Sequence, residues 1–383
     1  MIAHGESEST FRLVEQTDDL RSMSDTLRSV LESKSPATRV AEVADSGEGF
    51  DASLWQTLAS ELGVTGIMVP ENLGGLGMGW AETRIVLAEL GRSLACVPFA
   101  NSCVVATTLI ATSGDRDLAA EVLPGVADGS SIVAVALGDD SLLPPGGRSP
   151  IRATQIGDQW HLSGVQPFVQ HGLIAHRFLI LAERADGQHA WFLVESGAAG
   201  LEREEMACLD ATRPQARLTM TAVPGRQVGR VGDCDSLVSP VLDTAVVAAS
   251  CEASAASSHL LDLTVAYVSS RFQFGQPIGS FQALQHRLAD LALAVDTSVS
   301  AVEYAVAAAV HDPARFREAA SLAGFVCAET FYQAALEAIQ MHGGIGFTWE
   351  HQAHRYYRRA LSARAMLGAP SVHRERLLQS LSL

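Results

Sequence analysis

The spacing of apolar and polar residues changes twice along the chain. From about residue 10 to 125 it is helical. DASLWQTLASELG (51–63) begins with an aspartate suited to capping a helix and stops at a glycine. A second amphipathic helix is expected over 80–95, and the glycine-rich VPENLGGLGMG between the two indicates a loop. We therefore expect residues 1–127 to form a helical domain.

From about 130 to 235 the apolar runs become short and β-rich, with turn signals such as GDQ and ADGQ between them. The expected strands are SIVAVAL (131–137), RATQI (152–156), QWHLSG (159–164), RFLILAE (177–183), HAWFLVE (189–195) and ARLTMTAV (216–223). This pattern predicts a small antiparallel sheet domain over 128–236, built as a barrel or a sandwich.

Helical spacing returns after residue 240, in longer and alanine-rich segments. One apolar stripe follows three- and four-residue steps through Leu284, Leu288, Leu291, Val295, Val299 and Val302. We expect an antiparallel four-helix bundle over 237–383. The order of helical domain, β domain and helical bundle predicts an α+β fold of three parts.

Composition narrows the classes of function. A net charge of −16 argues against nucleic acid or an anionic membrane surface as a partner. Six scattered cysteines form no CxxC pair, which favours buried free thiols over metal sites or disulfides. The polar start MIAHGESEST and the lack of an uncharged apolar run of about 18 residues predict a cytoplasmic protein without a membrane span.

Two C-terminal segments carry the candidate chemistry, RFQFGQPIGSFQ (271–282) and QMHGGIGFTWEH (340–351). An arginine offers permanently charged donors that suit a pyrophosphate, a phenylalanine offers a flat face, and paired glycines leave backbone N–H groups open to a phosphate. The candidate ligand-binding residues are Arg271, Phe274, Gln282, Gln340, Gly343 and Gly344. The alternative is structural, with the arginine capping a helix C-terminus and the glycines making a tight turn.

Together with VPENLGGLG (69–77), these segments resemble the acyl-CoA dehydrogenase family over nearly the whole chain. The resemblance implies an FAD shared across a dimer interface: one subunit holds the isoalloxazine ring and its neighbour holds the adenine and the pyrophosphate. It also implies an acyl-CoA substrate and an electron-transferring flavoprotein as acceptor. Asp243 lies where the family has an acidic contact to the CoA adenine, but the supporting arginine is Val246 here, and a solvated helix-start aspartate is the alternative.

The chain departs from the family where the flavin ring and the catalytic base are expected. ALGDDSLLPPGG (136–147) stands in place of the Thr-Glu-Pro and Gly-Ser-Asp motif, and Phe168, Val169 and Gln170 stand in place of the Trp-Ile-Thr-Asn motif. The two positions that carry the family's glutamate base correspond to Leu367 and Ala245, neither of which can accept a proton.

Glu252 is the remaining candidate base. It lies seven residues beyond Ala245, on the same helix face but about 10 Å further along the axis, so a structural or cofactor-adjacent role is the alternative. His342 and His351 flank the GGIGF turn and could contact a cofactor or close an interface. HRYYRR (354–359) could form ion pairs with a partner or remain solvated, and neither cluster has metal-ligand or triad spacing.

The retained residues are those a subunit offers to its neighbour's flavin, and the missing residues serve its own ring and base. The resemblance therefore extends to the partner subunit of actinobacterial heterotetrameric acyl-CoA dehydrogenases, some of which degrade steroid side chains. The expected function is α,β-desaturation of an acyl-CoA in lipid or steroid catabolism, together with a second subunit. The alternatives are a self-sufficient homo-oligomeric dehydrogenase with an atypical base, or a flavin-free structural subunit.

Overall fold

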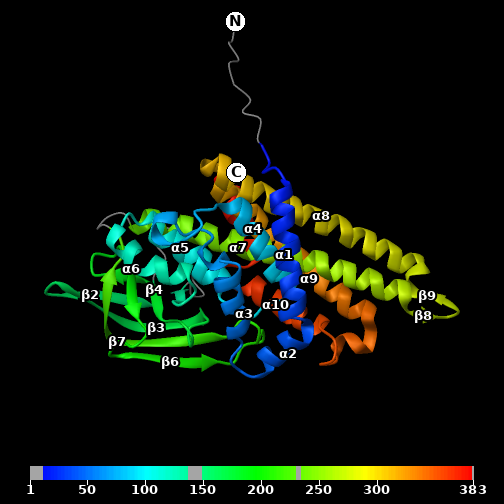
Figure 1. The fold of residues 1–383 in the computed structure, drawn as a ribbon, viewed down its shortest axis with the longest axis horizontal. Helices are drawn as coiled ribbons and strands as arrows, with labels where there is room; N and C mark the ends of the chain where they lie inside the picture. Colours follow the sequence, from blue (N-terminus) through cyan, green and yellow to red (C-terminus); the bar gives the residue numbers. More distant parts are fainter. Residues whose placement is uncertain (1–11, 137–148, 230–233, 382–383) are drawn as a thin grey trace, which may run out of the picture.

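Helices make up the first part of the chain in the computed structural model, which describes residues 12–136, 149–229 and 234–381 (Figure 1). Its α-helices are α1 (Asp18–Lys34), α2 (Ala37–Asp45), α3 (Ala52–Gln56), α4 (Trp80–Arg92), α5 (Thr107–Thr112) and α6 (Arg116–Ala127). Shorter helical turns are η1 (Thr57–Glu61), η2 (Val64–Gly66), η3 (Glu71–Leu73) and η4 (Phe99–Ala106). As predicted, Asp51 caps α3 by accepting the Leu54 N–H, and Gly63 ends the segment with a φ of +66°.

The middle part is a twisted sheet of β1 (Val133–Ala136), β2 (Ile151–Ile156), β3 (Gln159–Gln170), β4 (Arg177–Arg184), β5 (His189–Glu195), β6 (Leu201–Met206) and β7 (Gln215–Gln227). Most pairings are antiparallel, as expected, but β4 pairs in parallel with both β1 and β2, so the sheet is mixed. The sequence pattern did not predict β6. This strand, LEREEM, pairs with β7; its four central residues are exposed and its two end residues are half-buried, so it carries no alternation of apolar and polar positions.

Long helices form the last part: α7 (Cys234–Ser270), α8 (Gln282–His311) and α9 (Phe316–His342). They are followed by the shorter α10 (Ala353–Ala365) and α11 (Pro370–Ser380). Helix α9 packs against α7, α8, α10 and α11, so α11 is added to the four-helix bundle that the sequence predicts. Turns η5 (Ile278–Ser280), η6 (Pro313–Arg315) and η7 (Gly343–Phe347) connect these helices.

The hairpin of β8 (Phe272–Gln273) and β9 (Gln276–Pro277) joins α7 to α8 and lies at the end of the long helices farthest from the sheet (Figure 1). At the opposite end the sheet packs on the bundle, where α7 contacts β5 and η4 contacts both β1 and α7. The candidate residues therefore fall in two separate regions, the junction between the sheet and the helices and the exposed tip of the bundle.

Length and composition alone would allow α7 and α8 to cross a membrane, but 78% of the apolar window of α7 and 44% of that of α8 is buried within the fold. Core helices of globular proteins have the same composition. The thiols of Cys96, Cys103, Cys208, Cys251 and Cys327 are free, and all except the half-buried Cys208 are buried. The side chain of Cys234 lies outside the described residues.

Candidate functional site

A pocket lies at the junction between the sheet and the long helices, and the two positions that lack the family's base are in its wall. Ala245, on α7, and Leu367, after α10, both line a cavity of about 60 Å³. The remaining wall is mainly apolar, with alanines from α7 facing Leu94 and Phe331. The structure thus brings Leu367 and Ala245 into the wall of one pocket, but neither carries a group that can take a proton.

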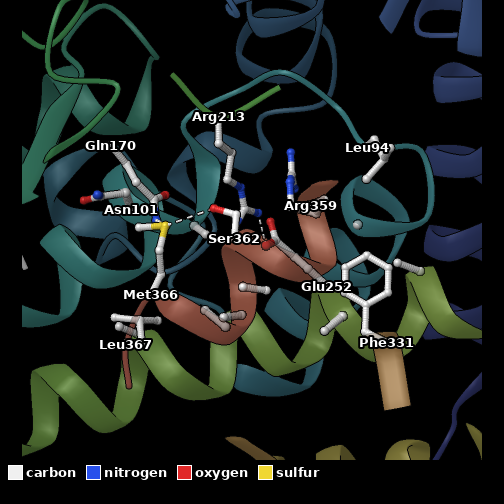
Figure 2. Close-up of a pocket in the computed structure, with 18 of the residues that line it drawn as sticks. Leu94, Asn101, Gln170, Arg213, Glu252, Phe331, Arg359, Ser362, Met366 and Leu367 are labelled. Atoms are coloured by element: carbon white, nitrogen blue, oxygen red, sulfur yellow. Dashed lines mark hydrogen bonds and ion pairs between the residues drawn. The ribbon is translucent and has the colours of Figure 1, made fainter. Parts of the chain in front are cut away.

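An ion pair occupies this pocket. Arg213, on the loop between β6 and β7, donates to the carboxylate of Glu252 in the middle of α7, and the two side chains point toward each other (Figure 2). Glu252 is 8% exposed, so its charge needs this partner. Helix α4 lies directly over it: a Cβ on Gly91 would come within 2.4 Å of the Glu252 Cα, so only glycine fits there. The geometry favours the structural role of Glu252 over that of a free base.

A second buried pair lies beside the first. Arg359, on α10, donates to the carboxylate of Asp210 and to the hydroxyl of Thr212, and all three side chains are buried. Burial disfavours the charged form of Arg359, but Asp210 and Glu252 outweigh it and raise the pKa of the guanidinium. The two pairs join the loop before β7 to α7 and α10, so they hold the sheet domain against the bundle.

At the end of β3, where the resemblance expects contacts to a flavin ring, side chains of the chain contact one another. The amides of Gln170 and Gln215 both donate to the thioether of Met366, at 3.4 and 3.1 Å. Val169 is 1% exposed and offers no hydroxyl, and Phe168 bulges from β3 with a φ of +59°. The residues at this end do not fit an isoalloxazine ring. Most of ALGDDSLLPPGG (136–147) lies outside the described residues.

The RFQFG segment has the opposite character, because it is exposed at the tip of the bundle. Arg271 follows α7, and its side chain makes no hydrogen bond or ion pair with the rest of the described chain. Its capping contact is made by the backbone, with the N–H donating to the Tyr267 carbonyl at 2.8 Å. Phe274 is 90% exposed at a φ of +54°, and Gln282 is exposed at the start of α8. The guanidinium is therefore free to bind an anion.

The GGIGF turn lies close to this segment. Gln340 is exposed near the end of α9, and Gly343 ends that helix with a φ of +63°. A Cβ at Gly343 or Gly344 would meet no atom within 4 Å, so the backbone there is open to approach. The Tyr267 hydroxyl donates to the His342 carbonyl at 3.4 Å, which joins the turn to the end of α7. These residues fit the adenine and pyrophosphate end of an FAD.

Asp243 lies elsewhere. It is 3% exposed on α7 and paired with Arg376 of α11, while burial raises the pKa of its carboxyl group. A contact to a CoA adenine stays a prediction, and in this structure the carboxylate faces Arg376. No group of three or more His, Cys, Asp or Glu side chains that could hold a metal is present in the described part of the chain.

Comparisons with known proteins agree with this architecture. The sequence model of the acyl-CoA dehydrogenase N-terminal domain matches residues 17–130, and that of the C-terminal domain matches residues 241–382. Acyl-CoA dehydrogenase IpdE2 of Mycobacterium tuberculosis is 32% identical over 340 residues, covering 87% of each chain. The chain belongs to the acyl-CoA dehydrogenase family, whose members are oxidoreductases and generally bind FAD.

Two of the similar solved structures each carry a double name. The Tcur3481–Tcur3483 steroid acyl-CoA dehydrogenase G363A variant aligns with a TM-score of 0.86 and 30% identity, over 95% of this chain and 98% of that one. The ChsE4–ChsE5 complex of Mycobacterium tuberculosis aligns with a TM-score of 0.88 and 27% identity, over 96% of this chain and 98% of that one.

Sequence reasoning did not identify Arg213 or Met366 as residues that decide the character of the pocket. It expected the arginines of HRYYRR (354–359) to pair with a partner or remain solvated, but Arg355 and Arg359 are buried and pair with Asp45 and Asp210 of the same chain. Each lies far along the chain from the side chain it contacts, so no local spacing reveals the pair. A buried glutamate in an alanine-rich helix was the one usable signal, because such a charge requires a polar partner.

Proposed function

We propose that this chain is the partner subunit of a hetero-oligomeric acyl-CoA dehydrogenase. Its exposed tip would supply the adenine and pyrophosphate half of an FAD site. A second, catalytically complete chain would supply the ring site and the glutamate base. The reaction would be α,β-desaturation of an acyl-CoA, with electrons passing to an electron-transferring flavoprotein.

One contrast between the two ends of the molecule carries this proposal. At the pocket, Gln170 and Gln215 contact Met366 where a ring would lie, and Glu252 is committed to Arg213. At the tip, Arg271 is exposed, and the Gly343–Gly344 backbone is open. A chain with only the second set can complete a neighbour's cofactor site but not its own.

The relatives support the same assignment and suggest the substrate class. One similar structure is named as a steroid acyl-CoA dehydrogenase and another as a complex of two differently named chains. We propose an acyl-CoA thioester from lipid or steroid breakdown as the substrate, bound mainly by the partner chain.

Co-expression tests the proposal. The chain would be purified alone and together with an acyl-CoA dehydrogenase from the same genome that carries the glutamate and the Trp-Ile-Thr-Asn motif. We expect a colourless, inactive protein alone, and a yellow, active complex with fewer FAD molecules than chains. A yellow chain that desaturates an acyl-CoA by itself would sink the proposal and favour the self-sufficient homo-oligomer.

A matched pair of arginine variants tests the half-site within the complex. Arg271→Ala removes an exposed and unpaired guanidinium, so the FAD content should fall several-fold. Arg152→Ala removes the same charge from β2, where the side chain is 61% exposed and paired with Glu183, and FAD content should stay at the wild-type level. Unchanged FAD in Arg271→Ala would instead point to a flavin-free structural subunit.

A further inference from the structure

Three aromatic rings, those of Tyr267, His342 and His351, form a row at the GGIGF turn. Tyr267 of α7 stacks on His342 with ring centroids 4.3 Å apart, and His342 lies 4.4 Å from the ring of His351. His342 is 3% exposed and directly precedes Gly343. A buried imidazole thus lies against the backbone that the proposed function assigns to the pyrophosphate.

Backbone contacts fix the proton positions on the two imidazoles. Nδ1 of His342 lies 2.7 Å from the Ala338 carbonyl, which can only accept, so this nitrogen carries a hydrogen and Nε2 has the lone pair. The Ala353 N–H donates to Nδ1 of His351 at 3.2 Å, so that ring carries its hydrogen on Nε2. His342 can therefore take a second proton and keep its bond, whereas a proton on His351 would break one.

The charges around His342 leave it sensitive to a new anion. Burial lowers the pKa of His342, while the bond to Ala338 favours the protonated ring. The other titratable groups on the neighbouring segments are Tyr267 on α7, Arg271 just after it, Glu337 on α9, Glu350 and His351 before α10, and His354, Arg355 and Arg358 on α10. Glu337 is paired with Arg287, and Arg355 is paired with Asp45. A pyrophosphate on the turn would bring two further negative charges to the backbone next to His342.

We propose that His342 is a charge-compensating residue of the FAD half-site: it takes up a proton at Nε2 when the pyrophosphate binds over Gly343 and Gly344. This inference rests on the proposed function. The two negative charges of the pyrophosphate would then be balanced by the Arg271 guanidinium and the imidazolium, and the open backbone N–H groups would donate hydrogen bonds to it. The proton comes from solvent, and no bond other than N–H forms or breaks.

The sign of the pH dependence follows from the direction of the shift. Binding of a dianion favours imidazolium, so the pKa of His342 is higher with FAD bound than without it. FAD affinity is therefore greatest below the pKa of the free site and falls as the pH rises through that of the occupied site. One linked proton limits the slope to about tenfold in affinity per pH unit. The pyrophosphate diester of FAD keeps its charge across this range.

The test uses the complex with its partner chain. FAD release on dilution would be followed by flavin fluorescence from pH 5.5 to 8 in the wild type and in His342→Gln and His311→Gln, the latter replacing an exposed histidine at the far end of α8. We expect affinity to fall with rising pH in the wild type and in His311→Gln, and to be nearly flat in His342→Gln. A flat wild-type profile, or an unchanged slope in His342→Gln, overturns the inference.

A second measurement needs no variant. Calorimetric titration of the flavin-depleted complex with FAD at pH 7, in two buffers of different ionisation enthalpy, counts the protons taken up per FAD bound. A clearly positive count is expected, and a count near zero overturns the role of His342 while leaving the half-site intact. Failure of the half-site is recognised separately, by FAD content that does not respond to Arg271→Ala.

Discussion

Arg213 and Glu252 form an ion pair inside the pocket that lies between the sheet and the long helices. The arginine comes from the loop before β7 and the glutamate from α7, 39 residues later in the chain. The pair therefore joins the sheet domain to the bundle. It also engages the carboxylate that the described residues contribute to the pocket wall.

Replacing Glu252 tests this structural role. Glu252→Gln leaves Arg213 charged and without its carboxylate in a position that is only 14% exposed, so the free energy of unfolding should fall by up to about 3 kcal/mol. Chemical denaturation of the isolated chain measures this. FAD content and turnover of the complex should be retained under conditions where the variant is folded.

A double variant controls for the charge that the single change leaves behind. Arg213→Met combined with Glu252→Leu removes both charges, and should recover most of the lost stability. If the Glu252→Gln complex is folded and contains FAD but shows no turnover, the structural role is contradicted and Glu252 is the catalytic base.

Restoring the family's base at its C-terminal position should not restore activity. Leu367→Glu places a carboxylate in the pocket wall, but the amides of Gln170 and Gln215 still contact Met366 where a flavin ring would have to lie. Without a hydride acceptor, removal of the α-proton leads to no desaturation. We expect the variant alone to lack flavin absorbance and dye-linked turnover, like its isosteric control Leu367→Gln. Flavin-dependent turnover specific to Leu367→Glu would show that the ring site is functional.

The fold could be predicted from sequence because it depends on local signals, and the candidate half-site could be proposed for the same reason. Changes in the spacing of apolar residues separate helices from strands. Arg271 and Gly343 lie within short motifs whose residue types alone indicate their chemistry. The pocket could not be predicted in the same way. Glu252 is plain in the sequence, but its meaning depends on Arg213, and that partner is set by tertiary packing.

Asp243 shows the same limit. Its place in the sequence left open a contact to a CoA adenine or a solvated position at a helix start. The structure contradicts the solvated position, because α11 brings Arg376 onto the buried carboxylate. The strand β6 is a different case, because an exposed edge with charged residues carries no periodic signal. Sequence patterns identify residues that face solvent or a local motif more readily than residues whose partners lie on distant elements.

Phe274 should serve binding at some cost to the fold. It is 90% exposed with a φ of +54°, a conformation that costs a non-glycine residue about 1 kcal/mol or more. In Phe274→Gly the relief of strain and the greater entropy of the unfolded chain oppose each other, so stability of the isolated chain should change by less than about 1 kcal/mol. FAD content of the complex should fall because the flat face is lost. Phe274→Tyr keeps the ring and should keep the FAD, and equal FAD in all three proteins would remove Phe274 from the site.

His171 should make the chain less stable in acid. It is buried beside the two ion pairs, and neither ring nitrogen has a hydrogen-bond partner among the described residues. Burial, followed by the charges of Arg213 and Arg359, lowers its pKa from 6.5 to about 3. Between these values the unfolded chain binds a proton that the folded chain does not. The free energy of unfolding therefore falls as the pH drops below 6.5, by up to about 1.4 kcal/mol per pH unit from this residue.

Urea unfolding at pH 5, 6 and 7 measures that slope. His171→Asn retains a residue type that tolerates the positive φ of 56° and removes the titrating ring, so its stability should vary less with pH than that of the wild type. His259, His354 and His373, each with a pKa lowered to about 4, leave a residual slope of the same sign. His311→Asn, at an exposed position, should keep the wild-type slope. An unchanged slope in His171→Asn would mean that the ring is already charged, or solvated, in the folded chain.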